Sequence, residues 1–296
     1  MTYPRAHLID TAQPGFYHIV SRCVRRSFLC GIDPVSGHSY EHRRSWIEAR
    51  LLHLASLFSL EVYAYAVMRN HYHLVVRLNP TQSQAWSKAE IAQRWVDINP
   101  PKHLGRIDQS LRQHRIQALL DNPTRLHLCR QRLSSLSWYM RFLNHPIACR
   151  ANQEDHCRGH FWEARYKSFA LLDETAIIAC MAYVDLNPIR AKTAVSLVDS
   201  DHTSIKQRLR QTDRTDLAPL PPGPGKYPLR LSLAAYVAYL QRTGLIPATT
   251  RSPPDARTRA QVLAMASYQR AYGAKDTIEL WLTTIGQRWS KSVALP

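Results

Sequence analysis

Residues 69–76 have the sequence Arg-Asn-His-Tyr-His-Leu-Val-Val, which places two histidines one residue apart at the start of a β-prone run. Successive side chains of a strand point to opposite faces, so His71 and His73 project from one face, about 7 Å apart along the backbone. Two imidazoles in this arrangement can bind one divalent ion. The alternative is a pair of half-buried histidines at a sheet edge. With 14 histidines in 296 residues, chance alone gives about 0.7 such pairs, so the pair needs independent support.

The sequence around this strand predicts an α+β fold. A hairpin joins strands over 62–68 and 71–78 through Arg69-Asn70. Helical spacing or β-prone composition predicts the other elements: a strand over 15–24, helices over 41–60, 126–143 and 174–187, and a strand over 161–171. Asp173 caps the last helix and Pro188 ends it. This order is typical of a ferredoxin-like antiparallel sheet with helices on one face, in which the histidine strand is central.

Composition divides the chain into three parts. The main domain is expected over 1–205, with a polar, basic and proline-punctuated helical insertion at about 79–124. A proline-rich linker follows over 206–228. The remaining residues, 229–296, predict a small C-terminal helical module.

The charge of the chain points to a polyanionic partner. It carries 39 Lys and Arg against 22 Asp and Glu, a formal net charge of +17. Nucleic acid is the leading candidate, because each neutralised phosphate releases counterions; a basic protein without a specific partner and an anionic membrane surface are the alternatives. The longest apolar run, near 51–60, is too short to span a bilayer, so a soluble cytoplasmic protein is expected.

The six cysteines form no Cys-x-x-Cys pair, and they are expected to be reduced and mostly buried. A zinc knuckle around Cys149, His156, Cys157 and His160 is the alternative, but the spacing matches no standard ligand pair.

A second motif lies about 110 residues after the histidines. Tyr183 and Asn187 are four residues apart and share a face of the predicted helix, away from its apolar stripe. Asn187 precedes a proline, so its amide oxygen lies near a helix C-terminus, whose partial negative charge favours a cation. The alternative is an Asn-Pro turn beside a tyrosine at the core boundary.

Together the two motifs predict a reaction centre. His71, His73 and the amide oxygen of Asn187 supply three ligands to Mg²⁺ or Mn²⁺ and leave positions for phosphate oxygens. Tyr183, one helical turn from the amide, can then attack phosphorus in line.

These motifs resemble those of the HUH single-tyrosine transposases, specifically the REP-associated tyrosine transposases of bacteria. The likeness covers residues 10–205 and depends on 15–19 with Arg22 and Arg25, then 68–76, 159–168 and 183–191. Arg69 departs from the pattern, because relatives often carry proline there.

The resemblance implies that His71 and His73 bind the metal with Asn187, and that Tyr183 is the nucleophile. It implies cleavage of single-stranded DNA beside REP-like hairpins through a reversible 5′-phosphotyrosine link, without a nucleotide cofactor. It also implies a transposase that associates with the nucleoid while it acts, as a monomer or a homodimer.

DNA contacts are expected from basic and aromatic side chains near the ends of two strands: Arg22, Arg25, Arg26, Trp162, Arg165 and Lys167. Two other functions remain open. One is a domesticated protein that binds DNA hairpins and cuts little or nothing, and the other is a metal phosphodiesterase whose nucleophile is water.

Overall fold

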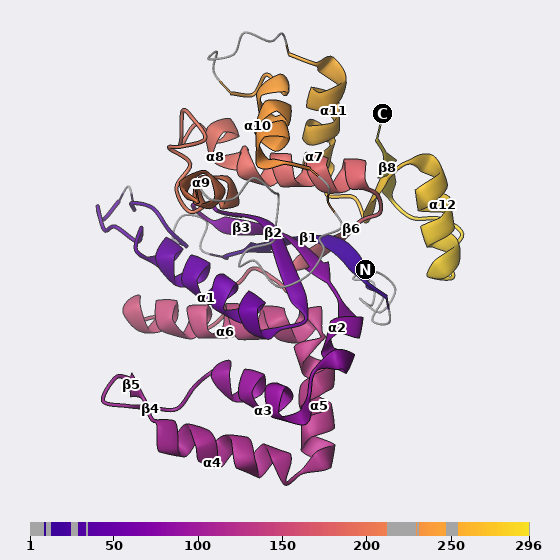
Figure 1. The fold of residues 1–296 in the computed structure, drawn as a ribbon. Helices are drawn as coiled ribbons and strands as arrows, with labels where there is room; N and C mark the ends of the chain where they lie inside the picture. Colours follow the sequence, from indigo (N-terminus) through magenta and orange to yellow (C-terminus); the bar gives the residue numbers. More distant parts are fainter. Residues whose placement is uncertain are drawn as a thin grey trace.

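The computed structural model describes residues 9, 13–24, 29–33, 35–211, 229, 231–246 and 254–295 (Figure 1). Arg25, Arg26 and most of the predicted linker lie outside the described residues.

A six-stranded sheet forms the centre of the fold. Its strand order is β2-β3-β1-β6-β7-β8. Four of its strands are adjacent and form one side of the sheet: β1 (Gly15–Arg22), β2 (Leu60–Val67), β3 (His71–Leu78) and β6 (Lys167–Leu171). These four pair antiparallel throughout. With one helix between β1 and β2 and a helical segment between β3 and β6, they form the predicted ferredoxin-like arrangement, and β3 is an inner strand.

The two faces of the sheet bury different hydrophobic clusters, because side chains alternate along each strand. On one face, Tyr17, Leu74 and Val76 pack toward α1 (Arg43–Leu57) and α6 (Leu136–Glu154). On the other, Val20 and Val75 pack toward α7 (Glu174–Asp185). Figure 1 shows α1 and α6 below the sheet and α7 above it. Helices α1 and α6 thus share a face, as predicted, whereas α7, which was expected on the same face, covers the opposite one.

The predicted insertion contains several short elements, most of which lie below α6 in Figure 1. They are α2 (Pro80–Ala85), α3 (Lys88–Asp97), the β4–β5 ribbon (Lys102–His103 and Arg106–Ile107), α4 (Gln109–Leu120) and α5 (Pro123–Leu133). A Ser87–Glu90 capping box starts α3. Ile91, Leu119 and Leu126 are buried in the same cluster as α1 and α6, so the insertion extends the core below the sheet.

The prediction of a single helix over 126–143 is wrong. Two helices replace it, α5 and α6, because the backbone leaves the helical region at Ser134 and Ser135. Helix α6 then continues through Pro146 to Glu154. Proline removes the N–H that would bond the carbonyl of Phe142, and Arg50 Nε donates to that carbonyl instead, at 3.2 Å.

Two other boundaries differ from the sequence prediction. The strand expected over 161–171 is regular only from Lys167, and upstream a single bridge joins Trp162 to Cys23. Helix α7 begins at the Asp173 cap, whose carboxylate accepts from the N–H of Ala176 at 2.8 Å, and ends at Asp185. Pro188 lies in the first turn of a short helix, α8 (Asn187–Arg190), so it starts a helix instead of only ending one.

The C-terminal segment is not purely helical, which corrects the prediction. Helix α9 (Ser204–Arg210) precedes this segment and extends into the predicted linker. The helices of the segment are α10 (Leu233–Arg242), α11 (Ala256–Ala264) with a 3₁₀ turn (Met265–Ser267), and α12 (Lys275–Thr284). Between and after them, β7 (Ala271–Gly273) pairs parallel with β6, and β8 (Ser292–Ala294) pairs parallel with β7. Among the described residues, no helix has the length and apolar character needed to cross a bilayer.

Candidate active site

The histidine strand faces α7. In the β1–β3 ladder, Arg22 pairs with His71 and Val20 pairs with His73. Because Val20 belongs to the cluster under α7, both histidines lie on that face of the sheet. The rings of His71 and His73 are 4.7 Å apart between centroids. The two imidazoles therefore project from the same face of the sheet, as the sequence predicts.

Tyr183 meets this pair from α7. Its ring centroid lies 5.6 Å from that of His73, with the planes nearly perpendicular. The two residues are 110 positions apart, and the packing of α7 on β3 brings them together. The structure thus gathers His71, His73 and Tyr183 at one place.

A third histidine, His18 on β1, was missed as a site residue. Its Nε2 lies 3.0 Å from His73 Nδ1, and both side chains are 0% exposed. Its ring also lies 6.0 Å from that of Tyr183. The sequence could have indicated His18. It is four residues from Arg22 on the same strand, so both side chains project from the same face, and the ferredoxin-like strand order places β1 beside β3.

All three imidazoles are neutral near pH 7. Burial lowers the pKa of His18 to about 3, with a contribution from His71. Burial and the nearby Arg22 lower the pKa of His71 to about 4. Burial and the neighbouring histidines hold the pKa of His73 well below its ordinary value. Neutral imidazoles keep the lone pair that a cation needs.

Hydrogen bonds orient two of these rings. His71 Nδ1 donates to the amide oxygen of Asn70 at 2.6 Å, which leaves His71 Nε2 with its lone pair. His73 Nε2 is buried and has no hydrogen-bond partner among the described residues. His73 Nδ1 and His18 Nε2 share one hydrogen bond. In the tautomer in which His73 Nδ1 carries the proton and donates it to His18 Nε2, His73 Nε2 has a free lone pair.

Asn187 is buried at 8% exposure at the start of α8, and its amide nitrogen has no partner in the described part of the chain. Asn187 forms no hydrogen bond with His71 or His73 in the described part of the chain. Within the described ranges, no group of three or more His, Cys, Asp or Glu side chains is placed to hold a metal ion. The zinc alternative at Cys149 and Cys157 gains no support. Most of the cysteines are buried, as expected, and only Cys149 and Cys157 of the six are exposed.

Tyr183 is covered by its surroundings and is 4% exposed. Its hydroxyl lies 3.5 Å from that of Tyr268, and the Arg190 guanidinium lies 4.5 Å from its ring centroid. Tyr268 has a left-handed backbone (φ 50°, ψ 46°) between the 3₁₀ turn and β7, and its ring stacks on Phe169. No sequence pattern around Tyr268 indicates that the C-terminal segment reaches the site.

A cavity of about 160 Å³ opens beside His71. Three of the residues expected to contact DNA line it: Arg22, Arg165 and Lys167. Arg22 lies 3.9 Å from the Glu163 carboxylate, an exposed pair. Trp162 lies elsewhere, with its indole N–H donating to the Asn144 carbonyl at 2.9 Å and its ring edge-on to Tyr72.

Comparisons with known proteins add one structural likeness. No family model and no curated protein matches the chain. Among solved structures, the chain is similar to a REP-associated tyrosine transposase bound to a REP hairpin. That match covers 78% of this chain and 97% of the other, with 12% sequence identity and a TM-score of 0.38. A function for this chain must therefore follow from its own residues.

Proposed function

We propose that the protein is a divalent-metal-dependent endonuclease and strand-transferase that cleaves and rejoins single-stranded DNA beside hairpins, with Tyr183 as the nucleophile. The observation that carries this proposal is that His71 and His73 from β3 meet Tyr183 from α7, with His71 lining a cavity. Cationic side chains line that cavity, and the chain carries a formal charge of +17. The negatively charged phosphate backbone of DNA is complementary to these cationic surroundings.

The donor set fits Mg²⁺ or Mn²⁺. His73 Nε2 and the Asn187 amide nitrogen are buried and have no hydrogen-bond partner within the described chain. A 180° flip of the Asn187 amide puts its oxygen, which can bind a cation, where the nitrogen is now. His71, His73 and Asn187 would hold the ion, with Asn70 fixing the His71 ring. When bound, such an ion polarises the phosphodiester and stabilises the charge that develops on it.

Tyr183 performs the covalent step. Its phenolic oxygen loses a proton and forms a bond to phosphorus, while the bond from phosphorus to the 3′-oxygen breaks and that oxygen gains a proton. The Arg190 guanidinium lies 4.5 Å from the Tyr183 ring centroid, a cation–π contact that helps to hold the ring in place. The product is a 5′-phosphotyrosine, and attack by a 3′-hydroxyl reverses the reaction and joins strands.

The test is adduct formation. A labelled oligonucleotide with a hairpin and a flanking tail, incubated with Mn²⁺, should give a covalent protein–DNA band on a denaturing gel. Tyr183→Phe should lose the band completely, and Tyr239→Phe, on α10, should keep it. An undiminished band in Tyr183→Phe would exclude this nucleophile. Cleavage that survives in Tyr183→Phe without any adduct would instead indicate a phosphodiesterase that uses water.

A second candidate is a hairpin-binding protein that does not cut. The observation in its favour is the cover over the nucleophile, since Tyr183 is 4% exposed and its hydroxyl lies against Tyr268. This candidate predicts hairpin binding by the wild-type protein without any adduct at saturating Mn²⁺.

A further inference from the structure

Aromatic rings and guanidinium groups alternate on the insertion and α6. The rings of Trp95, Trp138 and Phe142, which we call the tryptophan cluster, lie within 6.2 Å of one another between centroids. The Arg132 guanidinium lies 4.4 Å from the ring of Trp138 and 5.7 Å from that of Trp95. Arg141 lies 5.0 Å from Trp138 on the same helix. Each tryptophan is only partly buried, so part of the cluster reaches the surface.

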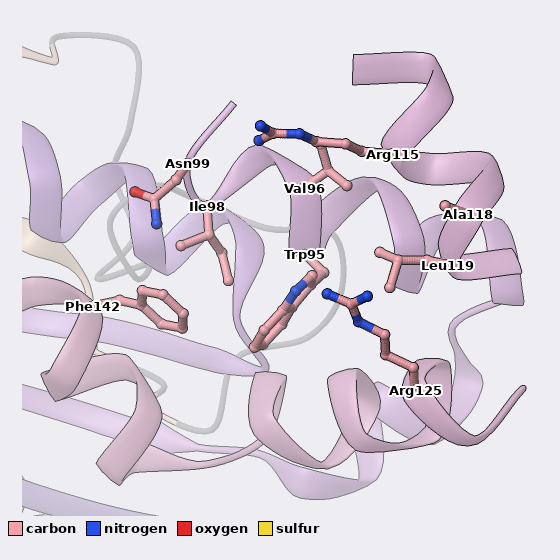
Figure 2. Close-up of a pocket in the computed structure, with 9 residues that line it drawn as sticks. All are labelled: Trp95, Val96, Ile98, Asn99, Arg115, Ala118, Leu119, Arg125 and Phe142. Carbon is pink, nitrogen blue, oxygen red and sulfur yellow. The ribbon is translucent and has the colours of Figure 1, made fainter. Parts of the chain in front are cut away.

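Trp95 and Phe142 of the tryptophan cluster line a cavity of about 370 Å³ formed by residues of α3, α4, α5 and α6. Figure 2 shows the Trp95 indole extending into it, with the Arg125 guanidinium beside the indole and Phe142 on the other side. Arg115 extends over the cavity from α4. This volume lies in the range of small-molecule sites, and an aromatic floor with a cationic rim suits a base attached to a phosphate.

The arginines of this region fall into two groups. Arg112 forms a double hydrogen bond with Asp97, both at 2.6 Å, and Arg130 donates to the Trp86 carbonyl at 2.9 Å. These two hold the insertion together. A second group has no ion pair or side-chain hydrogen bond with any described residue: Arg115, Arg125, Arg132 and Arg141. Four guanidiniums around aromatic rings, none matched by a carboxylate of the described chain, form a surface complementary to phosphate.

Two cavities that share lining residues lead from the catalytic site toward this region. A cavity of about 630 Å³ lies between α6 and residues 159–166. It shares Glu163, Ala164 and Arg165 with the cavity beside His71. Arg141 lines it too, and Arg141 stacks on Trp138. A strand that leaves His71 can therefore follow Arg165 and Arg141 to the tryptophan cluster.

We infer that the tryptophan cluster, with Arg115, Arg125, Arg132 and Arg141, is a second nucleic-acid subsite that binds unpaired nucleotides of the DNA strand extending from the catalytic cavity. The assignment of that strand rests on the proposed function. Bases stack on Trp95 and Trp138, and the guanidiniums bind the intervening phosphates. A free mononucleotide also carries a base and a phosphate, so the test must distinguish binding of the DNA tail from binding of a free nucleotide.

The test is equilibrium binding by fluorescence anisotropy, in a Tyr183→Phe background without divalent metal so that no strand is cut. The probes are a hairpin with a single-stranded tail and the same hairpin without the tail. The double variant Arg115→Gln/Arg125→Gln should weaken binding of the tailed hairpin about tenfold and reduce its log-affinity slope against log salt by about 0.7 per arginine. Binding of the blunt hairpin should not change.

The matched control is Arg106→Gln, on the exposed β5 strand of the same insertion, which should leave the affinities for both probes unchanged. Both substituted arginines in the double variant are exposed, so folding should be intact, and Trp95→Leu then tests stacking separately. Equal losses on both probes, or none on the tailed one, would overturn the inference. So would displacement of the tail by dAMP at micromolar concentration, which would identify a free-nucleotide site.

This outcome is separable from that of the proposed function. Tail-dependent binding that needs Arg115 and Arg125, in a protein that forms no adduct, would support the subsite while the nuclease assignment fails. An adduct together with tail-independent binding would support the nuclease assignment and overturn the subsite.

Discussion

Three neutral imidazoles lie in series beneath the phenol of Tyr183. His18 and His73 are both fully buried, and His18 Nε2 contacts His73 Nδ1 at 3.0 Å. A ligand histidine in a metal site almost always has its other nitrogen fixed by a hydrogen bond. In the proposed metal site His18 would be a positioning residue, because a hydrogen bond accepted from His73 Nδ1 selects the tautomer of His73 whose Nε2 can bind a cation.

The first prediction concerns this contact. His18→Phe keeps a buried ring but removes the acceptor, so affinity for Mn²⁺ should fall about 10- to 100-fold. His18→Gln, which retains an amide oxygen, should recover part of the loss. Mn²⁺ binding measured by electron paramagnetic resonance on folded protein gives the result. A His18→Phe variant with wild-type affinity would show that His18 has only a packing role.

The second prediction separates chemistry from DNA binding. His71→Ala should abolish the adduct and leave hairpin affinity within about twofold, because a neutral imidazole contributes no charge to phosphate binding. Gel analysis and anisotropy report the two quantities. If affinity collapses together with the adduct, His71 has a structural role.

At the scale of elements, the end of α7 is held by two helices from later in the chain. Asp185, two residues after Tyr183, is fully buried. Its carboxylate accepts from the Ile205 N–H at 2.9 Å and the Tyr236 hydroxyl at 2.7 Å, and also from the Ser204 hydroxyl. Burial raises the pKa of this carboxyl, which these donors partly oppose. Helices α9 and α10 thus fix the end of α7 that carries Tyr183.

The third prediction tests this anchor. Tyr236→Phe removes one donor from a buried carboxylate and should lower the free energy of unfolding by about 1–3 kcal/mol. Tyr239→Phe on the same helix removes a longer contact, 3.4 Å to Gln261, and serves as the control. Urea denaturation followed by circular dichroism compares them. Equal stability of the two variants would exclude an anchoring role for Tyr236.

Elements that depend on local pattern could be predicted from the sequence, and elements set by distant contacts could not. The β2–β3 hairpin follows from alternation around Arg69-Asn70, and its strand positions agree closely with the prediction. Nothing local marks the passage of α6 through Pro146, because its compensation comes from Arg50 on α1. Strands β7 and β8 have three residues each, too few to show a period.

The same division applies to the site. His71, His73 and Tyr183 were identifiable because strand and helix periodicity place them on the correct faces. Tyr268 was not, because only the parallel pairing of β7 with β6 brings that part of the chain to the site.

At the scale of the whole molecule, buried histidines make stability depend on pH. In the unfolded chain each imidazole takes up a proton near pH 6.5, whereas in the folded protein His71 stays neutral down to about pH 4 and His18 down to about pH 3. The unfolded state therefore binds more protons below pH 6.5. Their contribution to stability is present above that pH and is lost as the pH falls toward these folded-state values.

The fourth prediction follows. Between pH 6 and 4, the free energy of unfolding of the wild type should fall more steeply than that of His18→Phe, by up to about 1.4 kcal/mol per pH unit for the one imidazole removed. His114→Phe, a change at an exposed position, should retain the wild-type slope. Denaturation curves at a series of pH values measure it. Identical slopes for the wild type and His18→Phe would contradict burial of a neutral His18.

The position of β1 in the sheet has a consequence for synthesis of the chain. β1 is the earliest described strand, yet it lies between β3 and β6, and β6 is translated about 145 residues later. At about 5–20 residues per second, one hydrogen-bonding edge of β1 stays unsatisfied on the ribosome for on the order of ten seconds. The nascent chain must be shielded from aggregation during that interval, which makes chaperone supply and translation speed strong determinants of its yield.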